Sequence, residues 1–134
     1  MADSLTFDLV SPAKKLASFP VSQVVIPSAA GDMTAMPGHA PAVATLRPGL
    51  VRAFTAEGEK AYLVIGGFAE ISGSSVTVLA EEAEPREGVD AARVADLVAK
   101  QEKLAASLEA ESDARRAAEA RLNDLRNLEI LVRA

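Results

Sequence analysis

The stretch from Pro85 to Ala106, PREGVDAARVADLVAKQEKLAA, decides the fold of this 134-residue chain. It contains the last proline and the last glycine, because all seven prolines and all eight glycines lie within residues 1–88. Charged residues rise from 16 among the first 88 residues to 17 among the last 46. Since proline and glycine interrupt helices, the boundary separates two kinds of structure. We therefore expect one domain over residues 1–86 and a second over residues 87–134.

Upstream of this stretch, short apolar runs alternate with polar residues at the period of a β-strand. Turn pairs such as Pro37-Gly38, Pro48-Gly49 and Glu57-Gly58 separate the runs. We predict the α+β fold class, with an N-terminal antiparallel β-sandwich of about ten short strands followed by a C-terminal α-helical hairpin. The runs that carry the strand pattern are Leu5–Leu9, Val21–Ile26, Leu50–Phe54, Ala61–Ile65 and Val76–Leu79.

Downstream, eleven of the thirty residues from 91 to 120 are alanine, and apolar residues recur at helical spacing. Asp90 can cap a first helix that ends near Ala106. A second helix follows a turn near residues 109–113, where Ser112 or the residue after it can cap the helix. The predicted apolar faces comprise Val94, Leu97, Val98, Leu104, Ala105 and Leu108 on the first helix and Ala118, Leu122, Leu125, Leu128 and Val132 on the second.

No glycine or proline enforces the turn near residues 109–113. The same residues can therefore continue as one helix of about 45 residues, which would reach ~65 Å. A hairpin buries the leucine and alanine faces within the chain, whereas a rod must bury them against another protein. The sequence permits both forms.

The composition excludes several classes of function. The chain has no cysteine, which removes disulfides, thiolate nucleophiles and cysteine-based zinc sites. A net charge of −5 offers no positive field for a phosphate backbone, so we expect no nucleic-acid partner. We expect no secretory signal, because the first residues contain no basic region followed by an apolar run. We expect no direct membrane insertion, because no apolar run reaches the roughly 18 residues of a spanning helix. With one histidine and no Gly-x-Ser-x-Gly motif, we expect a protein that is not an enzyme.

Four features of the sequence could indicate a chemical site, but each has a simpler structural explanation. His39 lacks a second metal ligand, which favours a structural or interface role. Gly66-Gly67 lacks the pattern of a phosphate-binding loop and predicts a strand junction or bulge. Asp32, next to Gly31, is typical of an exposed turn. The acidic run within residues 81–87 indicates a solvated linker.

Four strings together resemble the ε subunit of bacterial F-type ATP synthases: Gly31–Pro41 (GDMTAMPGHAP), Leu46–Gly49 (LRPG), Gly66–Glu70 (GGFAE) and Val76–Ala80 (VTVLA). The resemblance covers the whole chain in order and spacing, because that family has an N-terminal β-sandwich followed by two helices. It implies a central-stalk rotor subunit that performs no bond chemistry itself and requires no cofactor.

The resemblance also implies partners. The sandwich would bind the γ subunit and sit on the c ring, coupling proton translocation to ATP synthesis. In many members the hairpin extends into the α/β catalytic head and blocks ATP hydrolysis. The chain would be peripheral on the cytoplasmic face of the bacterial inner (plasma) membrane. The implied residues are Gly31, Asp32 and Met33 for the c ring, Pro37, Gly38, His39 and Pro41 for γ, and Leu97, Leu104, Leu108, Leu122, Leu125 and Leu128 for the regulatory helices.

Asp90 and Arg93 carry a further implication. On their own they are explained by a helix cap and an i,i+3 pair, although arginine can also bind phosphate. Some members of the family bind ATP at the folded hairpin through an Ile/Leu-Asp-x-x-Arg-Ala motif. This chain reads VDAARV over residues 89–94, which keeps the aspartate and the arginine and departs at both flanks. The resemblance therefore implies a regulatory ATP at these two residues.

The alternative from another class is a stand-alone β-sandwich binding module with a coiled-coil oligomerisation tail. Tyr62 and four phenylalanines give such a module little material for an aromatic sugar platform. The module should self-associate, whereas a rotor subunit should be monomeric alone.

Overall fold

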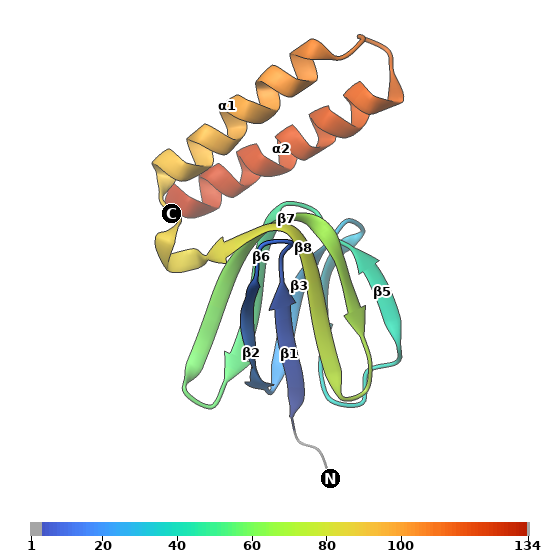
Figure 1. The fold of residues 1–134 in the computed structure, drawn as a ribbon, viewed down its shortest axis with the longest axis vertical. Helices are drawn as coiled ribbons and strands as arrows, with labels where there is room; N and C mark the ends of the chain where they lie inside the picture. Colours follow the sequence, from blue (N-terminus) through green and yellow to red (C-terminus); the bar gives the residue numbers. More distant parts are fainter. Residues whose placement is uncertain (1–3, 134) are drawn as a thin grey trace. The chain divides into compact units, whose positions relative to one another are not determined.

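The computed structural model describes the backbone of residues 4–133 and the side chains of residues 4–128. The described chain forms two compact units, which divide between Arg86 and Glu87. The first unit is built from strands and the second from two helices (Figure 1). In the described part of the chain, no helix is long and apolar enough to cross a bilayer.

The first unit is a β-sandwich, as predicted, but its strands are fewer and longer than the roughly ten short ones expected. Two of them, β7 with 14 residues and β8 with 11, arch over the unit in Figure 1. β7 pairs with β6 along its first half and with β5 along its second half, so it contributes to both layers. The strands are β1 (Leu5–Val10), β2 (Lys15–Val21), β3 (Gln23–Ser28), β4 (Gly31–Ala35), β5 (Ala42–Thr45), β6 (Gly49–Thr55), β7 (Gly58–Ile71) and β8 (Ser75–Pro85).

The strand order is β2-β1-β8-β7-β6-β3-β4, with β5 paired to β7 off this path. The ladders between the described strands are antiparallel, as predicted, with one exception. β1 and β8 run parallel, with Phe7 opposite Val76 and Leu9 opposite Val78. This pairing joins the first strand of the chain to the last, which the local turn signals in the sequence could not predict.

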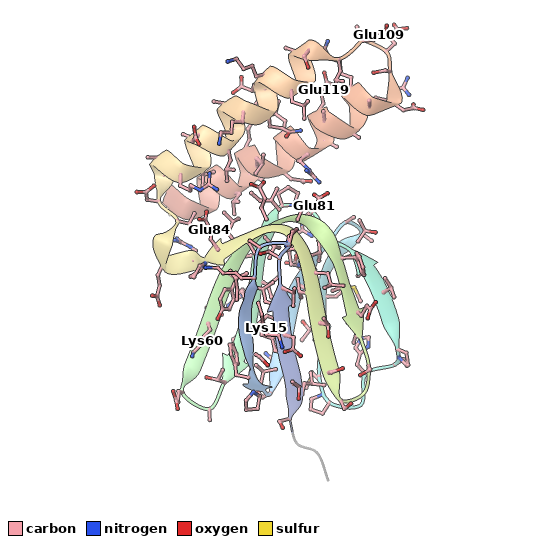
Figure 2. All side chains as sticks on the ribbon, viewed as in Figure 1. Lys15, Lys60, Glu81, Glu84, Glu109 and Glu119 are labelled. Atoms are coloured by element: carbon pink, nitrogen blue, oxygen red, sulfur yellow. The ribbon has the colours of Figure 1, made fainter. Side chains whose placement is uncertain are left out.

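Gly67 lies where β7 changes its neighbour from β6 to β5, which agrees with the junction predicted for Gly66-Gly67. Its φ is 104°, and a Cβ there would overlap the backbone of Leu79 and Ala80. Only glycine fits both conditions. The neighbouring acidic run is not a linker as expected: Glu81 and Glu84 belong to β8 (Figure 2), because the strand continues past this bend to Pro85.

The sandwich core follows the alternation of its strands. Phe7 is fully buried, with its ring centroid 5.5 Å from that of Phe19 and 6.2 Å from that of Tyr62. Around these rings pack β-branched and leucine side chains from both layers, which fill a core that has few aromatic residues. The largest of them that are at least 98% buried include Leu5, Leu9, Val24, Ile26, Val51, Val64, Val76 and Val78.

The second unit is the hairpin form of the helical segment. A short 3-10 turn, η1 (Arg86–Gly88), precedes α1 (Ala91–Ser107) and α2 (Asp113–Arg133). The Asp90 carboxylate accepts a hydrogen bond from the backbone N–H of Arg93 at 2.8 Å, as a helix cap does. Ser112 caps α2 in the same way, accepting from the N–H of Arg115 at 3.1 Å. Both predicted caps are confirmed.

The seam between the helices differs from the prediction at two positions, Leu104 and Leu108. Leu108 follows the end of α1 at Ser107 and is only half-buried. Leu104 was expected on the buried face, yet it is 50% exposed. At about 100° per residue it lies roughly 80° from the centre of the buried stripe, on the flank of the helix. Gln101 takes a buried position instead, and Val132 lies beyond the side chains that the structure describes. The buried residues are Val94, Leu97, Val98, Gln101 and Ala105 on α1 and Ala118, Leu122, Leu125 and Leu128 on α2.

Candidate docking surfaces

The residues that the resemblance assigns to the c ring lie at the start of β4, directly after the β3–β4 turn. Gly31 is exposed with a φ of 133°, and the Asp32 side chain is 63% exposed. Met33 is half-buried and packs against the sandwich core. The tip of this hairpin therefore presents Gly31 and Asp32 outward, while Met33 contributes mainly to packing.

Arg47 is a residue at this tip that sequence reasoning missed. Its guanidinium forms an ion pair with Asp32 at 2.5 Å and donates a second hydrogen bond to the carbonyl of Ser28 at 2.5 Å. Its backbone N–H donates to the carbonyl of Pro27 at 2.9 Å. The opposite charges of Asp32 and Arg47 were visible in the sequence, but only the strand register brings residues 15 positions apart together.

The Met36–Pro41 loop holds the residues assigned to γ. Gly38 has a φ of 86°, and the N–H of His39 donates to the carbonyl of Met36 at 3.0 Å, as in a type II turn. The Gly38 N–H donates to the carbonyl of Gly73 at 2.9 Å, which ties the loop to the β7–β8 turn. His39 Nδ1 lies 2.6 Å from the Ala40 carbonyl oxygen, which agrees with the structural use predicted for it. The assigned residues Pro37, Gly38, His39 and Pro41 all belong to this loop.

The structure does not bring the two predicted interfaces together. Gly31 and Asp32 begin β4, and the Met36–Pro41 loop follows the end of the same strand. Because a strand rises about 3.3 Å per residue, the strand separates them by roughly 15 Å. The two sets of residues therefore lie at opposite ends of β4 and do not form one combined site.

An apolar surface that the sequence did not predict covers the layer formed by β5, β7, β8 and β1. We call it the outer face and define it by Val10, Val43, Phe68 and Leu79. Phe68 lies opposite Leu79, and Leu79 lies opposite Val10 on the next strand, so these side chains share one side of the sheet. Val43 is 72% exposed and Phe68 is 40% exposed. Large apolar side chains exposed in one patch are typical of protein docking surfaces.

Two shallow grooves follow the outer face. One, of about 440 Å³, is lined mainly by Val10, Pro12, Phe68 and Leu79. The other, of about 520 Å³, lies along β5 and includes Pro41 and Val43. Because Pro41 belongs to the Met36–Pro41 loop, the outer face is continuous with the region assigned to γ.

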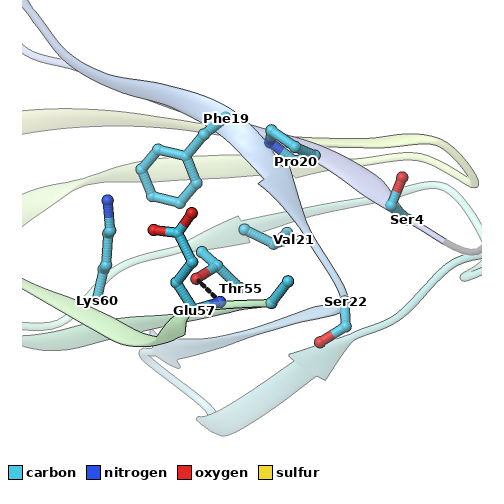
Figure 3. A pocket seen from close by; sticks show the side chains of 9 residues that line it. Ser4, Phe19, Pro20, Val21, Ser22, Thr55, Glu57 and Lys60 are labelled. Carbon is cyan, nitrogen blue, oxygen red and sulfur yellow. Dashed lines mark hydrogen bonds between the residues drawn. The ribbon is translucent and has the colours of Figure 1, made fainter.

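Another hollow, of about 440 Å³, lies beside the β6–β7 turn (Figure 3). Phe19 and Val21 line it, and the Lys60 ammonium lies 5.0 Å from the centre of the Phe19 ring. The Thr55 hydroxyl donates to the carbonyl of Gly58 and accepts from the N–H of Glu57, so it stabilises the β6–β7 turn. Among residues 4–128, no group of three or more histidine or acidic side chains could hold a metal ion.

Asp90 and Arg93, the residues assigned to ATP, lie together at the start of α1. The Asp90 carboxylate caps the helix, and the Arg93 guanidinium lies 3.8 Å from the carboxylate of Asp96. The sequence reading of an Asp90–Arg93 side-chain pair is thus replaced by a bond to the Arg93 backbone. Val94, which stands where the family motif has alanine, is fully buried.

Residues 4–86 match the family model described as "ATP synthase, Delta/Epsilon chain, beta-sandwich domain". The chain belongs to this family. The match confirms the resemblance seen in the four sequence strings and agrees with the β-sandwich predicted from the strand pattern.

Relatives in the delta/epsilon family extend the likeness beyond the sandwich. The "ATP synthase epsilon chain" of Fuscovulum blasticum is 61% identical over 99 residues, covering 74% of this chain and 76% of the relative. The protein of the same name from Mesorhizobium japonicum is 43% identical over 130 residues, covering 96% of each. Both helices therefore fall within the likeness.

A solved structure gives the same fold at lower identity. A chain in the cryo-EM structure of the Euglena gracilis mitochondrial ATP synthase, OSCP/F1/c-ring in rotational state 1, superposes with a TM-score of 0.77 at 23% identity. The superposition covers 98% of this chain and 82% of that one. At this identity the likeness concerns the fold.

Proposed function

We propose that the chain is a central-stalk rotor subunit of an F-type ATP synthase. It joins γ to the c ring and so helps couple proton translocation to ATP synthesis in the catalytic head. It performs no bond chemistry itself and requires no cofactor. Its place is peripheral, on the cytoplasmic face of the bacterial inner (plasma) membrane. The observation that carries the proposal is the outer face, an exposed apolar surface on a rigid sheet that continues into the loop assigned to γ.

The outer face suits a joint that transmits torque. A specific interface buries at least about 1,000 Å² in total and has an apolar centre with a polar rim. Phe68 and Val43 supply such a centre, while Glu70 and Thr45 lie directly beside them on the same side of the sheet. Because strands rather than loops carry the apolar side chains, the surface keeps its shape under load.

Charge placed on the outer face tests the γ contact. We expect the pair Val43→Glu and Phe68→Glu to weaken binding of the full chain to γ by more than tenfold, because carboxylates would be buried in the interface. Ala56→Glu, at the exposed β6–β7 turn, is the matched control and should bind as the wild type does. Binding would be measured by co-purification with the γ-containing complex. Unchanged binding of the double variant would exclude the outer face as the γ surface.

The helical hairpin adds a second function, inhibition of ATP hydrolysis by extension into the α/β catalytic head. Its support is that no described residue of the α1–α2 turn is glycine or proline, and that side-chain hydrogen bonds hold the turn together with backbone ones. The Ser112 hydroxyl donates to the Glu109 carbonyl at 2.8 Å, and the Arg115 guanidinium donates to the Leu108 carbonyl at 3.2 Å. These bonds can be lost without breaking either helix.

Deleting residues 89–134 should raise ATP hydrolysis by the complex and leave its assembly intact. A second variant keeps every residue but prevents extension. Glu102 and Arg126 form an ion pair across the helices at 3.5 Å, so cysteines there can be joined by a short bismaleimide. We expect the cross-linked chain to release hydrolysis as the deletion does. Unchanged hydrolysis in both would reject inhibition and leave the rotor role standing.

For Asp90 and Arg93 the proposal is a regulatory ATP that favours the folded hairpin. Its support is the retained Asp-x-x-Arg spacing at the start of α1. Titration of the full chain with ATP by calorimetry tests it. Arg93→Ala should abolish the binding, whereas Arg116→Ala, on the exposed side of α2, should not. Equal affinities of Arg93→Ala and the wild type would dispose of the site.

A further inference from the structure

Arg47 binds both sides of the β3–β4 turn. One arm of its guanidinium donates to the Ser28 carbonyl, which precedes the turn, and the other meets the Asp32 carboxylate, which follows it. Its own backbone is fixed, because its N–H donates to the Pro27 carbonyl. The planar fork of an arginine can make two such bonds at once, which a lysine cannot.

Hydrogen bonds from its own N–H groups also hold the backbone of the β3–β4 turn. The N–H of Ala29 donates to the carbonyl of Thr45 at 2.8 Å, and the N–H of Ala30 donates to the buried hydroxyl of Ser28 at 3.2 Å. Thr45 is the last residue of β5, and Arg47 lies in the segment that joins β5 to β6. The tip of the hairpin is therefore attached to a neighbouring part of the sandwich at four points.

The bonds made by Arg47 change the role expected for Asp32. A carboxylate at an exposed tip suggests a charge offered to a partner, but one oxygen of Asp32 is already bound by Arg47 within the chain. Besides Asp32, which is exposed but already paired with Arg47, the tip presents Ala29, Ala30 and Gly31, all exposed and all small. Small residues let another backbone approach closely, so the tip is suited to recognition by shape.

We propose that Arg47 is a positioning residue for the c-ring contact, and that Asp32 acts as its partner inside the chain. The inference rests on the proposed function, because the ring is the partner assigned there. Arg47 holds the alanine-glycine tip in the shape that meets the polar loops of the ring. Losing Asp32 frees one side of the turn and losing Arg47 frees both sides, so losing Asp32 in addition to Arg47 does no further harm.

A double-mutant cycle tests this coupling. The full chain, bound to γ, is measured for binding to purified c ring as wild type, Arg47→Ala, Asp32→Ala and the double variant. We expect Arg47→Ala to bind about tenfold more weakly, Asp32→Ala to show part of that loss because the bond from Arg47 to Ser28 remains, and the double variant to equal Arg47→Ala. Arg47→Lys should recover only part of the loss. If the double variant lost the product of both effects, Asp32 would contact the ring directly and the inference would be overturned.

Arg52→Ala is the matched control, because Arg52 forms a comparable ion pair with Glu59 at 2.6 Å elsewhere on the sandwich. It should bind the ring as the wild type does. Binding to γ should stay unchanged in all variants; a loss of γ binding in Arg47→Ala would indicate general damage and overturn a positioning role. Ring binding by Arg47→Ala equal to that of the wild type would also overturn it.

Amide hydrogen exchange in the isolated full chain separates this inference from the proposed function. The N–H groups of Ala29 and Ala30 should exchange faster in Arg47→Ala than in the wild type or in Arg52→Ala. If the wild type failed to bind the c ring, the proposed function would be wrong, while faster exchange in Arg47→Ala would still show that Arg47 holds the turn. Unchanged exchange would overturn this role of Arg47 whatever the result of the ring-binding measurement.

Discussion

The β-sandwich and the helical hairpin are held together in different ways. In the sandwich, strands distant in sequence lie side by side, such as β1 and β8, and an apolar core lies between the layers. In the hairpin, two consecutive helices pack along one seam that includes the polar side chain of Gln101. Non-local pairings are lost together, whereas a local helix pair can open at its turn. The difference suits one unit to keep a fixed shape and the other to change.

The largest expected effect is on the stability of the hairpin, and it tests whether the two units unfold independently. Leu125 is 2% exposed in the seam, so Leu125→Ala should destabilise the hairpin by about 2–5 kcal/mol. The helical signal in far-ultraviolet circular dichroism should be lost at a lower temperature, while amide exchange in the strands stays slow. Asn123→Ala, exposed on the same helix, is the control. Strands that opened together with the helices would show that the two units are not independent.

The next prediction addresses the rigidity of the sandwich. Gly67→Ala places a Cβ against the backbone of Leu79 at a positive φ, whereas Gly58→Ala has a positive φ with open space around it. We expect Gly67→Ala to destabilise the sandwich by about 1–3 kcal/mol more than Gly58→Ala does. Chemical denaturation followed by the signal of Tyr62 measures both. Equal effects would mean that the bend in β7 yields, and that the sheet is less rigid than proposed.

The sequence predicted much of this architecture because the signals were local. The loss of glycine and proline after Gly88, the cap at Asp90 and the turn before Asp113 each depend on neighbouring residues. The start of α1 and the turn between α1 and α2 therefore lie where the sequence pattern predicted them. The loop at Met36–Pro41 was found in the same way, from its proline and glycine.

What the sequence could not predict depends on register between distant strands. The Arg47–Asp32 pair, the parallel β1–β8 ladder and the outer face all require knowing which residues lie opposite one another. A one-residue change of register would turn Phe68 inward and dissolve the outer face. The prediction for Leu104 was wrong because apolar residues at helical spacing do not show which of them lie at the centre of the buried stripe and which lie on its flank.

A smaller effect concerns the turn of the hairpin. Ser112→Ala removes the cap of α2, which should cost the folded hairpin about 1 kcal/mol. The extended rod needs no cap at this position and gains a good helix former, so its share should rise about fivefold. Stronger inhibition of ATP hydrolysis measures the shift. Ser107→Ala, whose hydroxyl donates to the Leu104 carbonyl inside α1, is the control. Equal inhibition by both variants would show that the cap does not hold the hairpin closed.

The smallest expected effect sharpens the comparison most. Gln101 donates a hydrogen bond from its amide to the carbonyl of Ala118 at 2.9 Å across the seam. Gln101→Leu removes this bond but leaves an apolar side chain of similar size, so stability should change by less than about 1 kcal/mol. The bond fixes where one helix sits along the other, which an apolar contact does not.

Spin labels at Ala99 and Asn123 measure that difference. In Gln101→Leu we expect a broader distribution of distances between the labels at nearly unchanged stability. A distribution as narrow as that of the wild type would mean that leucine packing alone sets the register. Broadening would instead show that the buried amide keeps one hairpin among several of similar energy. The alignment of the two helices in the hairpin would then depend on one polar hydrogen bond, which can be exchanged for another when the hairpin opens. The fold of the sandwich, in contrast, depends on core packing that it cannot lose without unfolding.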